Sequence, residues 1–208
     1  MDNAEYLDRL LLRYAGSFDI YKPYTINGVE YPAYGYFFSC VEKYVLTQEA
    51  NLWKARSYEH ILFLDVEELL QQHIDEISKA ISGYIEPKLI CKGQSTPGKD
   101  HMYSYITVIA VCGYTPQKEV LKAWKRFKYE KGYRFNLEGY SQAHLALVCM
   151  DEEKIYTNYQ GRVLKKTLRE VFRDVREGKP GFDEVCARQG ITCRRQEEQD
   201  FSSDTLMK

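Results

Sequence analysis

Residues 58–82 read YEHILFLDVEELLQQHIDEISKAIS, and this stretch decides the fold class. Its first part, residues 58–64, is a short apolar run of the kind that forms a buried strand. Its second part repeats apolar side chains at the spacing of one helix face, at Leu69, Leu70, Ile74, Ile77 and Ile81. Asp65 fits the N-cap of this helix and Gly83 fits its end. We therefore expect a strand followed by a helix over residues 66–82, a building unit of α/β layer proteins.

The chain before this stretch is expected to form a helix and a β-hairpin. Residues 2–15 place apolar side chains at helical spacing. Residues 18–26 and 29–40 are rich in β-forming side chains, and they flank Asn27-Gly28. This dipeptide predicts a tight hairpin turn because both residues tolerate positive φ.

The chain after it continues the alternation of strands and helices. Strands are expected at residues 102–112, 141–150 and 154–158, and helices at residues 116–131 and 162–177. The segments 44–54 and 87–100 are expected to connect elements, the first as a loop or a short helix and the second as a long loop.

Together these elements predict a single domain of the α/β (α+β) class over residues 1–178. Its helices are expected to pack on a mixed or largely antiparallel sheet, in the order α-β-β-β-α-β-α-β-β-α. Residues 179–208 are polar and mixed in charge towards their end, and we expect them to form a loosely ordered tail.

The composition is that of a globular protein in water. The 208 residues carry 29 Lys and Arg against 30 Asp and Glu, and 44% are hydrophobic. No apolar run approaches the length of a membrane span, and the first residues lack the basic region of a signal peptide. The six cysteines form no Cys-x-x-Cys pair, and three of them, Cys40, Cys112 and Cys149, lie in apolar runs that fit buried thiols. We therefore expect a cytoplasmic protein that makes no membrane contact.

Positive charge is concentrated in the second half of the chain. Residues 1–100 hold 10 basic and 15 acidic side chains (net −5), whereas residues 101–208 hold 19 and 15 (net +4). On helical wheels the third and last helices each carry a basic stripe, and Trp124 and Phe127 are expected to anchor the third helix on the sheet. The predicted anion-binding residues are Lys118, Lys122, Lys125 and Arg126 on the third helix and Lys165, Arg169, Arg173 and Arg176 on the last.

Two such stripes favour a non-enzymatic binding protein whose anionic partner is nucleic acid or an acidic protein. A solvated helix face carries the same pattern, and that interpretation stays open. A further alternative is a structural homo-oligomer in which an acidic helix over residues 65–76 faces the basic helices of another copy.

The chain is rich in tyrosine, with 18 residues of this type. Several fall in the expected hairpin: Tyr21, Tyr24, Tyr31, Tyr34 and Tyr36. Packing of aromatic side chains across strands is the simpler interpretation, and a stacking platform for bases or sugars is the alternative.

Motifs of cofactor and metal chemistry do not occur in the sequence. It contains no Gly-x-Gly-x-x-Gly, no Walker lysine loop and no Gly-x-Ser-x-Gly elbow. The histidines, His60, His73, His101 and His144, lack the spacing of metal ligands. We therefore expect neither a cofactor nor a metal.

The element order of residues 1–112 resembles the core of the PD-(D/E)xK nucleases, which hold a divalent metal with acidic residues on neighbouring strands. The resemblance implies a divergent or inactive metal-dependent nuclease with Glu30, Glu59 and Asp65 as the carboxylates of its metal pocket. No lysine stands two residues after Glu59, which departs from the nuclease motif.

Four further segments carry a second resemblance. They are YFFSCVEKYVLT at residues 36–47, MYSYI at 102–106, KRFKYEKGYRF at 125–135 and VCMDEEKIYTN at 148–158. With these segments the chain resembles an uncharacterised family of bacterial proteins, a domain of unknown function, over most of residues 1–178. The resemblance implies a bacterial cytoplasmic protein and carries no assigned chemistry.

Overall fold

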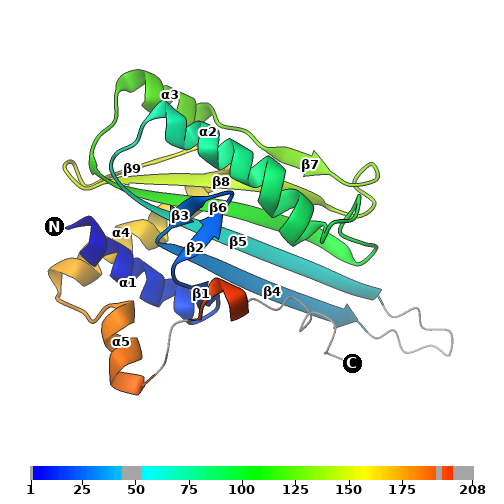
Figure 1. Ribbon diagram of the computed structural model, residues 1–208, viewed down its shortest axis with the longest axis horizontal. Helices are drawn as coiled ribbons and strands as arrows, with labels where there is room; N and C mark the ends of the chain where they lie inside the picture. Colours follow the sequence, from blue (N-terminus) through cyan, green and yellow to red (C-terminus); the bar gives the residue numbers. More distant parts are fainter. Residues whose placement is uncertain (1, 44–52, 191–193, 199–208) are drawn as a thin grey trace.

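A seven-stranded mixed sheet forms the centre of the computed structural model, which describes residues 2–43, 53–190 and 194–198 (Figure 1). The strands are β1 (Asp19–Tyr21), β4 (Ala33–Lys43), β5 (Trp53–Glu68), β6 (His101–Tyr114), β7 (Glu130–Gly132), β8 (Tyr140–Cys149) and β9 (Lys154–Thr157). They follow the order β1-β4-β5-β6-β8-β7, and β9 pairs with β8 alongside β7 on the outer edge. β5, β6 and β8 are parallel, and the remaining pairs are antiparallel.

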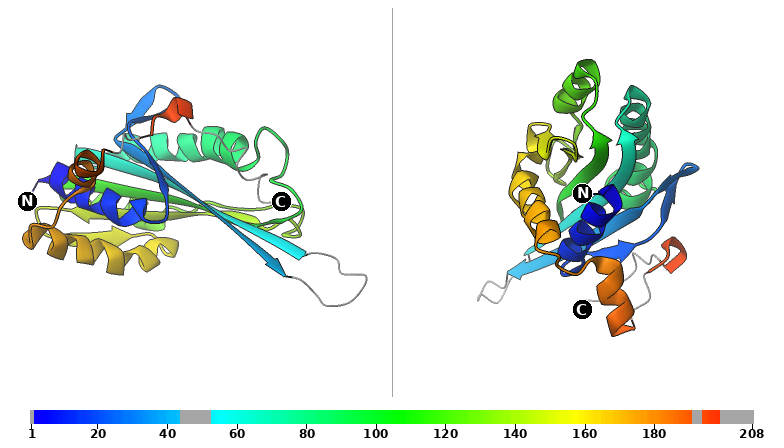
Figure 2. Two further views of the ribbon diagram at one scale, coloured as in Figure 1. Left: turned by 90° about the horizontal axis from the view of Figure 1, so that it is seen from below. Right: turned by 90° about the vertical axis from the view of Figure 1, so that its left-hand side faces the viewer.

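Helices cover both faces of this sheet (Figure 2). One face carries α2 (Gln71–Ala80), the π-helix η1 (Ile81–Ile90), α3 (Lys118–Arg126) and a separate pair of strands, β2 (Tyr24–Ile26) and β3 (Val29–Tyr31). The other face carries α1 (Asn3–Ala15), the 3-10 turn η2 (Gln160–Leu164), α4 (Lys165–Arg176) and α5 (Phe182–Gln189). A short 3-10 turn, η3 (Gln196–Glu198), follows. The predicted α/β class is confirmed.

The opening apolar run forms the middle of β5, as predicted. Ile61 and Phe63 pack into the core under α1 and α4, whereas Leu62 and Leu64 pack into the core under α2 and α3. Successive strand side chains point to opposite faces, so a strand covered on both sides is apolar at every position.

The junction between β5 and α2 lies later than predicted. β5 continues through Asp65 to Glu68 because β6 pairs with it in parallel as far as Tyr114. Leu70 therefore occupies the N-cap position, and its N–H donates a hydrogen bond to His73 Nδ1 at 3.0 Å. The predictions that Asp65 caps the helix and that the helix begins at the next residue are wrong.

Gly83 does not end the helix either. The chain continues as η1 through Gly83 and Pro87, because Ile81, Ile85 and Leu89 keep an apolar face buried on the sheet. Glycine inside a helix costs about 1 kcal/mol relative to alanine, and burial of three large apolar side chains stabilises by more than that. The loop expected from residue 87 begins only after η1.

The third helix is shorter than predicted. α3 ends at Arg126, and Phe127 has extended dihedral angles (φ −54°, ψ 128°). Beyond it the carbonyl of Tyr129 accepts a hydrogen bond from the N–H of Ala143 at 3.0 Å, and β7 pairs with β8. Pairing with the sheet edge therefore replaces the last helical turns, and Phe127 lies outside the helix that it was expected to anchor.

The turn at Asn27-Gly28 forms as predicted, with φ values of 51° and 81°. The arms of the hairpin are interrupted at Pro23 and Pro32, because proline has no N–H to continue a ladder. The five tyrosines of this region are buried, and the rings of Tyr24 and Tyr34 stack at 4.2 Å. Aromatic packing therefore explains this group.

The segment after residue 178 is not a loose tail throughout. Phe182 and Cys186 of α5 are buried against α1, and Lys22 forms an ion pair with Asp183 at 2.7 Å. The expectation is therefore wrong for α5, while residues 191–193 and 199–208 lie outside the described part. Residues 44–52, expected to form a loop or a short helix, also lie outside it.

Candidate anion-binding cleft

The two basic helices meet at the outer edge of the sheet. α3 packs on one face through Trp124, which is fully buried, and α4 packs on the opposite face through Leu168 and Val171. Both helices contact β9, the edge strand between them (Figure 1). The stripes are therefore neighbours, although the helices lie on opposite sides of the sheet.

A cleft of about 420 Å³ lies along β9 between the two helices. Its lining is Lys125, Glu153, Lys154, Ile155, Tyr156, Thr157, Arg162, Lys165 and Arg169. Five of these nine side chains are basic, and they come from α3, β9, η2 and α4. We call this the anion-binding cleft.

Packing of the helices directs the basic side chains into the cleft. Lys125 follows the buried Trp124, and its Nζ lies 4.6 Å from the ring centre of Tyr156 on β9. Lys165 and Arg169 are four residues apart on α4, so they occupy one helix face beside the buried stripe. The guanidinium of Arg162 lies 4.6 Å from the ring centre of Tyr159.

Asn158 holds the connection between β9 and η2 in place. Its Oδ1 accepts hydrogen bonds from the N–H groups of Leu145 (2.9 Å) and Gly161 (2.8 Å). Its Nδ2 donates to the carbonyls of Ala143 (3.0 Å) and Phe127 (3.2 Å). One buried side chain thus ties β8, the end of α3 and the start of η2 together.

Gly161 is required by the same arrangement. A Cβ at this position would lie 2.2 Å from the carbonyl oxygen of Leu145, so a larger residue would move η2 away from β8. The position of Arg162 in the cleft depends on this close approach.

Four of the basic groups have no carboxylate partner. No ion pair involves Lys125, Arg162, Lys165 or Arg169 within residues 2–43, 53–190 and 194–198. Lys154 pairs with Glu152 at 2.8 Å, and this contact raises the pKa of Lys154. The acid of the cleft, Glu153, is itself paired with Arg176. The cleft therefore carries a local excess of positive charge in a nearly neutral chain.

The structure divides the eight predicted residues. Lys125, Lys165 and Arg169 line the cleft, while Lys118, Lys122 and Arg126 lie outside it on exposed parts of α3. Arg173 pairs with Glu177 at 3.9 Å, and Arg176 with Glu153. Sequence reasoning missed Lys154 and Arg162, because neither lies on a helical stripe.

The carboxylates of the nuclease alternative do not come together. Glu30 and Asp65 line a cavity of about 190 Å³ beside α2. Glu59 precedes Asp65 by six residues on β5, which separates their Cα atoms by about 20 Å. One metal ion cannot bind both. In the described part of the chain, no three His, Cys, Asp or Glu residues are grouped to hold a metal.

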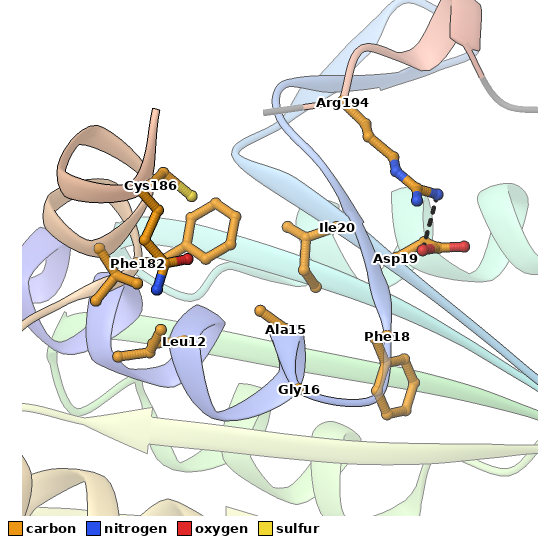
Figure 3. A pocket seen from close by; sticks show the side chains of 11 residues that line it. Leu12, Ala15, Gly16, Phe18, Asp19, Ile20, Phe182, Cys186 and Arg194 are labelled. Atoms are coloured by element: carbon orange, nitrogen blue, oxygen red, sulfur yellow. Dashed lines mark ion pairs between the residues drawn. The ribbon is translucent and has the colours of Figure 1, made fainter. Parts of the chain in front are cut away.

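Another hollow, of about 400 Å³, lies where α1, β1 and α5 meet (Figure 3). Its lining is mainly apolar, with Leu12, Ile20 and Phe182 from the three elements. The charged groups at its margin, Asp19 and Arg194, form an ion pair at 2.7 Å. The hollow therefore lacks the charge excess that distinguishes the anion-binding cleft.

The family that matches the chain agrees with the resemblance expected from the sequence. A family model described as a domain of unknown function (DUF8052) matches residues 2–170. The chain belongs to this family. All residues that line the anion-binding cleft fall inside the DUF8052 match, which ends within α4, whereas α5 falls after it. Searches of curated proteins and of solved structures gave no match.

None of the helices in the part of the DUF8052 chain that the structure describes has both the length and the apolar character needed to cross a bilayer.

Proposed function

We propose that this protein is a non-enzymatic nucleic-acid-binding protein and that the anion-binding cleft receives the phosphate groups. The observation that carries the proposal is the convergence of four unpaired cations, Lys125, Arg162, Lys165 and Arg169, from opposite faces of the sheet onto one exposed edge. Basic side chains that release counterions from phosphates supply most of the affinity in non-specific nucleic-acid binding.

The surroundings of these cations favour nucleic acid over an acidic protein. Lys125 and Arg162 each lie over a tyrosine ring, and such contacts hold the cations in place. Aromatic rings beside phosphate-binding cations suit a ligand that alternates phosphates with planar bases. A carboxylate-rich peptide has no planar bases to use the rings in this way.

The cleft lining also supports binding rather than catalysis. Its hydroxyl groups belong to Tyr156 and Thr157, and the lining contains no His or Cys to activate them. Its carboxylate, Glu153, is engaged by Arg176.

A cytoplasmic location agrees with the cysteines and is part of the proposal. Cys40, Cys91, Cys112 and Cys149 carry free thiols. A reducing compartment keeps thiols in this state, and nucleic acid is available there.

The test is fluorescence anisotropy with labelled single- and double-stranded oligonucleotides over a series of salt concentrations. Lys125→Gln combined with Arg169→Gln removes two charges from the cleft. Affinity at low salt is expected to fall tenfold or more, and the slope of log K against log salt to decrease by about 2.

The matched control is Lys122→Gln combined with Arg173→Gln, which removes the same charge from α3 and α4 outside the cleft. Its affinity is expected to stay within about threefold of the wild type. Equal losses in both double variants would contradict a localised site. Absence of oligonucleotide binding, with binding of polyglutamate instead, would replace nucleic acid by an acidic protein.

A homo-oligomer is the remaining alternative, but the acidic surface that it would use differs from the expected one. Its acidic surface was expected on one helix, but Asp65, Glu67 and Glu68 belong to β5. Light scattering at low and high salt tests it, because a contact between acidic and basic surfaces would dissociate as salt rises.

A further inference from the structure

Part of the sheet face under α1 and α4 is left without a helix. Figure 2 shows that these helices and α5 lie over one end of the strands, while β5, β6 and β8 extend beyond them. The uncovered part holds the first residues of β6 and β8. If another element covered these residues, they would be apolar. They are aromatic and polar instead.

A row of four rings runs across this uncovered face. The rings of Tyr103 and Tyr105 stack at 4.5 Å, and Tyr103 lies 6.3 Å from the ring of Tyr140 on β8. At the other end, Tyr105 lies 4.5 Å from the ring of His144. The three tyrosines are half-buried, so the row is held by mutual packing and still reaches solvent.

Hydrogen-bonding groups border the rings. Gln142 Nε2 and His144 Nε2 are hydrogen-bonded at 2.8 Å, and the Gln142 side chain is half-buried. Glu59, the register partner of Tyr105, accepts a hydrogen bond from Thr107 Oγ1 at 2.6 Å. Planar rings edged by amide and carboxyl groups can both stack on a base and pair with its polar edge.

The ring row begins beside the anion-binding cleft. Thr157, which lines the cleft, pairs with Ala146, two residues from His144 on the same face of β8. Asn158 fixes the start of η2 to Leu145, the immediate neighbour of His144, and Arg162 follows in η2. Figure 2 shows the first turn of α4 directed towards the uncovered strands. The cleft and the ring row therefore lie on neighbouring segments of β8, β9 and η2.

We propose that the ligand is single-stranded nucleic acid, with its phosphates in the anion-binding cleft and its bases packed against the ring row of Tyr105, Tyr103 and Tyr140. This inference rests on the proposed function and narrows it. Only unpaired bases are free to pack on such a row, because the bases of a duplex are stacked on one another. Charge complementarity at the cleft places the strand, and the rings that continue from it give the bases a surface.

The experiment compares three ligands of equal length, about 12 nucleotides. They are an oligothymidine, an abasic strand that keeps the phosphates and lacks the bases, and a duplex. Anisotropy at fixed salt is expected to give about tenfold or greater preference for oligothymidine over the abasic strand. The duplex is expected to bind no better than the abasic strand.

Variants assign the preference to the rings. Tyr103→Leu combined with Tyr105→Leu is expected to lower oligothymidine affinity to the abasic level while leaving abasic affinity within about twofold. Tyr103→Phe and Tyr105→Phe keep the rings and are expected to keep the preference. Tyr114→Leu removes an exposed tyrosine at the far end of β6 and serves as the control.

The outcomes separate this inference from the proposed function. Equal affinity for all three ligands, unchanged by the leucine variants, overturns base stacking and leaves phosphate binding standing. Absence of binding to every strand, the abasic one included, overturns the proposed function itself. If the double leucine variant fails to fold, photocrosslinking of a strand containing 5-iodouracil to the wild type decides. Adducts at residues 103, 105, 140 or 144 support the inference, and adducts only elsewhere overturn it.

Discussion

Glu86 and Glu59 lie on opposite sides of the same sheet, and their surroundings differ. The first is buried and the second is half-buried. Glu86, on η1, accepts hydrogen bonds at Oε1 from Lys131 (2.7 Å), Cys91 (3.1 Å) and Tyr133 (3.3 Å). Burial alone would raise the pKa of Glu86, but these donors outweigh it and hold the pKa below its usual range. The carboxylate is charged and satisfied.

Glu59 has one hydrogen bond, from Thr107, and no cation beside it in the described residues. Burial raises the pKa of Glu59, and the Thr107 contact offsets this only in part. The Glu86 carboxylate therefore has three donors, whereas the Glu59 carboxylate has one donor and lies across from the half-buried Tyr105. A carboxylate with a single donor keeps acceptor capacity that a ligand could use.

The largest expected effect concerns Glu86, whose carboxylate accepts three hydrogen bonds. Glu86→Ala leaves Cys91, Tyr133 and the Lys131 ammonium without their shared acceptor, and we expect a loss of about 3 kcal/mol in the free energy of unfolding. Urea denaturation measures it. Glu130→Ala, at an exposed carboxylate 3.6 Å from Lys128, is the control and should change stability by less than about 1 kcal/mol. Equal effects in the two variants would show that the Glu86 network is not structural.

The next effect concerns the boundary between the cleft and the sheet. Asn158→Ala leaves the buried N–H groups of Leu145 and Gly161 unpaired, and we expect a loss of about 2 kcal/mol in the free energy of unfolding. Because η2 is then no longer fixed to β8, oligonucleotide affinity should fall as well. Asn158→Asp keeps the acceptor oxygen and should recover part of the stability; no difference between Asp and Ala would contradict the role of Oδ1.

Stability should also depend on pH through Glu86. Its folded pKa is below the unfolded value, so its contribution is complete above about pH 4.5 and is lost as pH falls through the folded pKa. The difference in unfolding free energy between wild type and Glu86→Gln should therefore shrink in acid. Thermal melts from pH 7 down to pH 3 measure the difference, and a constant gap across that range would refute the assignment.

The sequence predicts the strands better than their boundaries. The alternation of apolar side chains that places Ile61 and Phe63 opposite Leu62 and Leu64 is local, and it predicted β5. The extension of β5 past Asp65 is not local, because it depends on pairing with β6 some 45 residues later. The early end of α3 has the same origin in the pairing of β7 with β8.

The cleft was predictable only in part for a related reason. Helical wheels identify which side chains share a face, and Lys125, Lys165 and Arg169 were found in this way. They do not show which faces meet, because that depends on α3 and α4 lying on either side of β9. Asn158 and Arg162 belong to the turn that joins the elements, and the sequence signal for them was an Asn-x-x-Gly after a strand. The ring row of β6 was visible only as alternating tyrosines, Tyr103 and Tyr105.

The smallest expected effect concerns Glu59. Its contribution to stability changes with pH in the opposite direction from that of Glu86. Because the folded pKa of Glu59 is raised, the folded state binds its proton more tightly, and this stabilisation is lost as pH rises through the folded pKa. Glu59→Gln removes the charge, so it should raise the free energy of unfolding at pH 7 by less than about 1 kcal/mol and change little near pH 4. Glu67→Gln, at an exposed position on the same strand, is the matched control and should be neutral at both pH values. Destabilisation by Glu59→Gln at pH 7 would mean that a partner holds Glu59 ionised, and the contrast between the two carboxylates would then disappear.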